Sequence, residues 1–120
     1  MRLLAIPLLA ATLLCACQTA SYRATSQLAG TNWEARDAGP RGSSFGELLF
    51  SSKLTPAGMG VVQLSSQRQA FYQVLDGKLV LRYGGENHAF DFALDGDTLT
   101  LDALSATGKA LGSQHFDRHP

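Results

Sequence analysis

The chain has 120 residues, two cysteines and ten acidic against ten basic side chains, so its formal charge is zero. That length limits it to one small domain. The balanced charge excludes the broad basic field with which proteins bind nucleic acid, so no nucleic-acid partner is expected.

The first sixteen residues have the layout of a secretory signal peptide. Met1-Arg2 gives a positive start, and Leu3 to Leu14 is almost wholly Leu, Ala and Ile. A membrane-spanning helix needs about 20 apolar residues, and this run ends sooner, in the polar stretch from Gln18 to Ser21. We therefore expect residues 1–16 to be a signal peptide rather than a transmembrane helix.

Both cysteines stand at the end of this run, in Leu14-Cys15-Ala16-Cys17. The stretch resembles the lipobox of bacterial lipoproteins, in which a small residue precedes a cysteine that is acylated and becomes the new N-terminus. The resemblance implies that Cys17 is lipidated, with palmitate-type acyl chains as the anchor. The alternative is an ordinary signal peptide cut nearby. A metal site at the cysteine pair would need further soft ligands, and the sequence has no other cysteine.

The residues after Cys17 predict where the chain is held. Gln18 rather than Asp follows the cysteine, which in Gram-negative lipoproteins resembles the sorting pattern for the outer membrane. We expect a lipid-anchored protein of the cell envelope, in the outer membrane and facing the periplasm. Residues 17–29 are polar and lack periodicity, which predicts a lipidated N-terminus and a flexible tether. Residues 30–118 are then the folded domain.

From Gly30 onward apolar and polar residues alternate, as is typical of half-buried strands. Asp76-Gly77 lies between two alternating runs and predicts a type I′ hairpin, because that turn needs positive φ at both central residues. The pairs predicted are Val74 with Leu79 and Tyr72 with Leu81. A second hairpin is predicted at Asp95-Gly96. Its predicted pairs are Phe92 with Leu99 and Phe90 with Leu101.

Weaker strands are predicted over residues 31–37, 46–52, 59–65 and 113–118. The best helical candidate, residues 104–111, contains Gly108 in its middle and favours a loop. About eight short strands predict an all-β domain, either a small antiparallel up-and-down barrel or a sandwich.

Three features, Leu28 to Trp33, the repeated hairpins and the final His115 to Arg118, resemble the small lipocalin-like (calycin-type) bacterial lipoproteins. In that group a tryptophan opens the first strand and an arginine near the end packs on it. The resemblance implies a closed barrel in which Trp33 and Arg118 meet. The alternative leaves Arg118 solvated at a frayed strand end.

Five aromatic side chains are predicted to point inward, and they either fill the core or line a cavity for one small apolar ligand. They are Trp33, Tyr72, Tyr83, Phe90 and Phe92.

No catalytic or metal-binding set emerges from the remaining residues. His115 and His119 would lie about 13 Å apart along a strand, which is too far for one ion. Asp95-Gly96-Asp97 lacks the alternate ligands of a calcium loop, and no Gly-x-Ser-x-Gly elbow is present. We therefore expect no enzyme, no cofactor and no metal.

Together these features predict a non-enzymatic, membrane-anchored envelope lipoprotein that binds a small apolar ligand or another envelope protein. Its expected partners are the membrane, through the lipid anchor, and that ligand or protein. The alternative is a lysozyme-inhibitor-like, protein-binding lipoprotein, because Leu104 to Gly108 resembles the Ser- and Gly-containing loop of such inhibitors.

Overall fold

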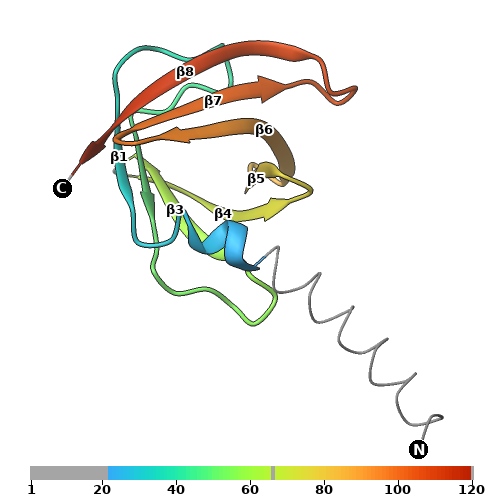
Figure 1. Cartoon of the computed structure of the whole chain (residues 1–120). Helices are drawn as coiled ribbons and strands as arrows, with labels where there is room; N and C mark the ends of the chain where they lie inside the picture. The colour runs from blue at the N-terminus through green and yellow to red at the C-terminus, as the bar shows by residue number, and fades with distance from the viewer. Residues whose placement is uncertain (1–21, 66, 120) are drawn as a thin grey trace, which may run out of the picture.

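Eight antiparallel strands form a closed up-and-down barrel in the computed structural model, which describes residues 22–65 and 67–119 (Figure 1). Consecutive strands are neighbours all the way round, and β1 pairs with β8 to close the sheet. The all-β antiparallel domain predicted from alternation is confirmed, and of its two predicted forms the barrel is observed and the sandwich is excluded. The strands are β1 (Asn32–Ala35), β2 (Glu47–Phe50), β3 (Gly60–Ser65), β4 (Arg68–Leu75), β5 (Lys78–Tyr83), β6 (Glu86–Asp95), β7 (Thr98–Leu104) and β8 (Ala110–His119).

The seam between β1 and β8 brings Trp33 opposite Arg118. The Arg118 guanidinium carbon lies 5.2 Å from the centroid of the indole, within reach of a cation–π contact. The predicted meeting of these two residues is confirmed.

The first predicted hairpin is also confirmed. Asp76 and Gly77 both have positive φ, 52° and 76°, as a type I′ turn requires. The pairs observed include Tyr72 with Leu81 and Val74 with Leu79.

The register predicted for the second hairpin is wrong by two residues. Phe92 pairs with Leu101 and Leu94 with Leu99, so the turn is Gly96-Asp97. Gly96 takes the positive φ, 59°, at the first central position, where a type II′ turn needs glycine. A shift by two keeps every side chain on its face, so Leu99 and Leu101 remain in the core.

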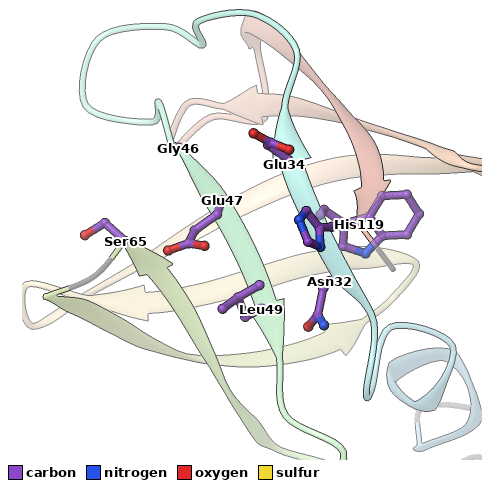
Figure 2. A pocket seen from close by; sticks show the side chains of 8 residues that line it. Asn32, Glu34, Gly46, Glu47, Leu49, Ser65 and His119 are labelled. Atoms are coloured by element: carbon purple, nitrogen blue, oxygen red, sulfur yellow. The ribbon is translucent and has the colours of Figure 1, made fainter.

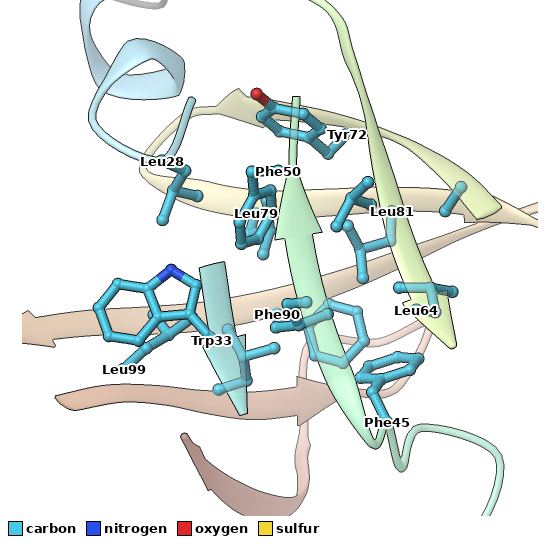
Figure 3. Close-up of a cluster of buried hydrophobic side chains, with 14 of the residues drawn as sticks. Leu28, Trp33, Phe45, Phe50, Leu64, Tyr72, Leu79, Leu81, Phe90 and Leu99 are labelled. Carbon is cyan, nitrogen blue, oxygen red and sulfur yellow. The ribbon is translucent and has the colours of Figure 1, made fainter. Parts of the chain in front are cut away.

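Packed apolar side chains occupy the barrel interior (Figure 3). The buried cluster draws on every strand of the barrel, and its largest members are fully enclosed. These are Trp33, Tyr72, Phe90, Phe116 and the leucines 28, 48, 64, 79, 81, 99 and 101. Such packing is what stabilises a small domain whose described part contains no cysteine.

A short helix over residues 22–26 covers one end of the barrel. Thr25 and Leu28 are fully buried there, and the Thr25 Oγ1 accepts the Val74 backbone N–H at 2.9 Å. Residues 22–29 were expected to belong to the flexible tether, and this part of the expectation needs correction. One helical turn has no detectable apolar period, and the burial of Leu28 depends on the barrel end that it covers.

The loop of residues 36–46 covers the opposite end. Phe45 is 3% exposed, and Gln114, itself 2% exposed, holds the loop from β8. The Gln114 Nε2 donates to the carbonyls of Asp37 and Phe45 at 2.8 and 2.7 Å, and its Oε1 accepts the Phe45 N–H at 3.0 Å. Both ends of the barrel are therefore covered by the chain itself.

In the part of the chain that the structure describes, no helix is both long and apolar enough to cross a membrane.

Candidate functional site

Three of the five aromatic residues predicted to point inward belong to the buried core, and the other two pack against it. Trp33, Tyr72 and Phe90 are almost completely buried, and Tyr83 and Phe92 are partly buried against the same cluster. Phe45 from the covering loop makes edge-to-face contacts with Tyr83 and Phe90, with centroid distances of 6.0 and 5.9 Å. These contacts place side chains where the expected ligand would have to lie.

The predicted lipidation site, Cys17, lies outside the described residues, as do residues 1–16. Lipidation therefore stays a prediction.

A groove of about 590 Å³ lies on the outer surface, beside β1, β2, the end of β3 and the end of β8 (Figure 2). We call it the acidic groove. It is lined by Asn32, Trp33, Glu34, Gly46, Glu47, Leu49, Ser65 and His119.

The groove exists because β2 and β3 stop pairing before β3 ends. Their ladder contains only the pairs Leu49 with Gln63 and Phe50 with Val62. A register shift between Gln63 and Ser65, in the pairing of β3 with β4, marks a bulge, and bulges bend a strand. Figure 2 shows the two strands apart at Gly46 and Ser65, with the Glu47 side chain between them.

Carboxylates from neighbouring strands meet beside this groove. Glu34 on β1 is directly opposite Glu47 on β2 and Asp117 on β8, so all three point outward in one row. Like charges that are directly opposite destabilise a sheet. The sequence therefore places Glu34 between two other carboxylates, each directly opposite it on a neighbouring strand.

Of these three carboxylates, only Asp117 has an ion-pair partner among the described residues. Arg36 donates to it through Nε at 3.1 Å and also through Nη2. This hydrogen bond and the positive charge lower the pKa of Asp117 and raise that of Arg36. Within residues 22–65 and 67–119, Glu34 and Glu47 have no ion-pair or side-chain hydrogen-bond partner. A cationic group entering the groove would meet two uncompensated carboxylates.

The histidines lie in three separate places. His115 Nδ1 is 2.7 Å from Asp37 Oδ2, His88 stacks on Tyr83 at 3.9 Å, and His119 lines the groove. Among the described residues, no group of three or more His, Cys, Asp or Glu side chains is arranged to hold a metal ion.

Sequence reasoning missed the groove. Glu34 and Glu47 look like ordinary solvated positions of two separate strands, and only the register places them opposite each other. The sequence signal for the groove was an outward carboxylate on each of two consecutive strands. This signal identifies a site only when the strand pairing is known.

No protein-family model matches the chain, and neither the curated proteins nor the solved structures give a significant match. The small eight-stranded antiparallel barrel is consistent with a lipocalin-like fold.

Proposed function

We propose that this chain is a non-enzymatic lipoprotein of the cell envelope, which is anchored through Cys17 and binds another envelope protein at the acidic groove. The observation that carries the binding proposal is the uncompensated pair Glu34 and Glu47, directly opposed at the wall of a groove. The chemistry of that pair selects a partner that presents a lysine or arginine side chain.

Anchoring is supported by the sequence alone. Residues 1–16 have the layout of a signal peptide, and Ala16-Cys17 resembles a lipobox cleavage point. Each buried acyl CH₂ contributes about 0.8 kcal/mol, so two or more chains hold a protein at the membrane stably. Gln18 supports the outer membrane as the location, with the barrel in the periplasm.

Binding of a protein is better supported than binding of a small apolar ligand in the barrel. A ligand inside would have to displace packed aromatic side chains and the covering loop with Phe45. A partner at the groove displaces only solvent, and its cationic group relieves the repulsion between Glu34 and Glu47.

The test is a calorimetric titration of the lipidated protein, held in detergent micelles, with a short peptide rich in lysine and arginine. The Glu34→Gln/Glu47→Gln variant should bind at least about tenfold more weakly, equivalent to 1.4 kcal/mol. The affinity of the wild type should fall as salt is added. The variant should not unfold earlier, because the substitutions remove a repulsion.

Glu86→Gln is the matched control, since Glu86 is an exposed carboxylate at the start of β6, away from the groove lining. It should leave the affinity unchanged. Equal affinities for the wild type and the groove variant would contradict the proposed binding site.

A further inference from the structure

Large apolar side chains gather on the outer surface of the barrel over β3, β4 and β5. Phe71 on β4 is 52% exposed and pairs across the ladder with Val61, which is 38% exposed. Three hollows of about 230, 260 and 130 Å³ adjoin Phe71. We call this surface the Phe71 face, and its apolar members are Leu54, Met59, Val61, Phe71, Leu75 and Val80.

This face borders the point where the chain enters the barrel. The loop of residues 51–59 supplies Leu54 and Met59, and it runs beside the short helix of residues 22–26 (Figure 1). A β-carbon built on Gly58 would be 3.5 Å from the Tyr22 Cα. Tyr22 is itself 43% exposed, so it extends the apolar surface toward the preceding residues of the chain.

The helix shortens the link between the barrel and the proposed anchor. Residues 22–29 pack on the barrel end, so only residues 18–21 separate Cys17 from Tyr22. Five residue steps span at most about 18 Å in an extended chain. An anchored Cys17 therefore holds this end of the barrel, and the Phe71 face beside it, close to the bilayer surface.

The charges at this face fit a bilayer. Lys53 and Arg82 are the charged residues that line its three hollows, and no carboxylate lines any of them. Apolar side chains bordered by lysine and arginine are the composition of surfaces that lie in the membrane interface, where the basic groups attract anionic lipid.

We infer that the Phe71 face docks on the bilayer that holds the lipid anchor. The inference rests on the proposed lipidation of Cys17, and it adds the orientation of the barrel relative to the membrane. The acidic groove and the Phe71 face share only β3: Val61 near its start belongs to the face and Ser65 at its end lines the groove, so the groove stays accessible while the face is covered. The end closed by loop 36–46 is then the end of the barrel farther from the anchor.

The test uses the lipidated protein in vesicles of phosphatidylethanolamine and phosphatidylglycerol that carry a spin-labelled lipid. A fluorophore is attached in one variant to Gln69→Cys, beside Phe71, and in another to Lys109→Cys, in the exposed turn before β8, which lies across the eight-stranded barrel from β4. Interfacial faces bury about 5–10 Å into the headgroup boundary, so the label at position 69 should be quenched at least about twofold more strongly.

Phe71→Ser, added to the first labelled variant, should reduce quenching to the level at position 109. Leu111→Ser is the matched control, because Leu111 is 57% exposed on β8 and should not contribute. Phe71 is half exposed, so its loss leaves the core intact.

Mass spectrometry of the same samples separates the two proposals. A chain without added lipid mass would contradict the anchoring and, with it, the docking. A lipidated chain with equal quenching at positions 69 and 109 would overturn the docking alone. In that case the Phe71 face stays in water and is open to a protein partner.

Discussion

Trp33 and Arg118 are the two residues at the seam of the barrel. The Trp33 Nε1–H donates to the Thr31 Oγ1 at 2.8 Å, while the Arg118 guanidinium lies over the ring. These contacts hold the edge and one face of an indole that is only 1% exposed. The pair was predictable because closure of a sheet brings its first and last strands together.

Arg118→Ala removes the cation–π contact. We expect the free energy of unfolding to fall by about 0.5–1 kcal/mol, the range for an exposed arginine. The emission of the single tryptophan should shift to longer wavelength, because the indole gains water. Denaturant titration and fluorescence measure both effects. Arg41→Ala, in the exposed covering loop, should change neither, and an unaltered Arg118→Ala protein would contradict the seam contact.

Cys17 and Cys15 should differ in their effect on anchoring. Bulky Leu14 precedes Cys15, whereas small Ala16 precedes Cys17 and suits the cleavage position. Cys17→Ser should therefore abolish lipidation, and Cys15→Ser should preserve it. Detergent-phase partitioning of the two variants measures this. A Cys15→Ser protein found in the aqueous phase would reverse the assignment.

Among the elements, the two hairpins differ in how far sequence determines them. The sequence Asp76-Gly77 is compatible with a single turn position and therefore one strand register, because both residues take positive φ. In Asp95-Gly96-Asp97, Gly96 can occupy either central position of a two-residue turn, so two registers preserve the same apolar face. The choice between them depends on how Phe90 and Leu101 pack with the rest of the barrel, which alternation does not encode.

Gly77→Val tests the first turn. A β-branched residue at φ 76° should lower the free energy of unfolding by about 1–3 kcal/mol. Thermal unfolding gives the measurement. Gly46→Val is the matched control, since its β-carbon would meet no atom within 4 Å, and it should have a much smaller effect. Equal midpoints for the wild type and Gly77→Val would show that this turn is not as described.

The loop of residues 36–46 is attached to β8 by a contact that depends on pH. Asp37 accepts the backbone N–H of His115 at 2.8 Å and lies beside its ring, and these hydrogen bonds lower the pKa of Asp37 below its usual value of 3.8. A carboxylate with a depressed folded-state pKa stabilises the fold above pH 3.8, and this stabilisation is lost as pH falls through the folded-state pKa.

We therefore expect stability to fall as pH drops through and below 3.8, in part because Asp37 becomes protonated. Asp37→Asn should be less stable than the wild type at neutral pH, and its stability should depend less on pH in this acid range. Denaturant midpoints measured from pH 6 to pH 2, roughly the span of carboxylate titration, make the comparison. Parallel curves for the two proteins would contradict a contribution from Asp37.

For the molecule as a whole, sequence predicted an antiparallel all-β domain, as a barrel or a sandwich, but it did not predict the acidic groove. Alternation encodes which side chains point inward, so Tyr72 and Leu81 were assignable in advance. Alternation does not encode the volume that the barrel encloses, which is why a filled core and a ligand cavity were both compatible with the sequence. It also does not show where a ladder ends, and the groove depends on the early end of pairing between β2 and β3.

The same limit applies to the helix and the covering loop. Leu28 and Phe45 are buried because each sits over an open end of the barrel, and Gln114 holds the loop from 69 residues away in the chain. No local sequence pattern predicts such contacts. The orientation that we propose on the membrane depends on the helix, which shortens the expected tether.

Photocrosslinking in living cells of the organism that makes the protein tests binding at the acidic groove directly. A photoreactive amino acid replaces Leu49, which lines the acidic groove, and in a second variant it replaces Leu111, outside the groove. We expect a defined protein adduct from position 49 that disappears when Glu34→Gln and Glu47→Gln are added, and no such adduct from position 111. An adduct that survives loss of both carboxylates, or none from position 49, would contradict the proposal that this groove binds a cationic protein partner.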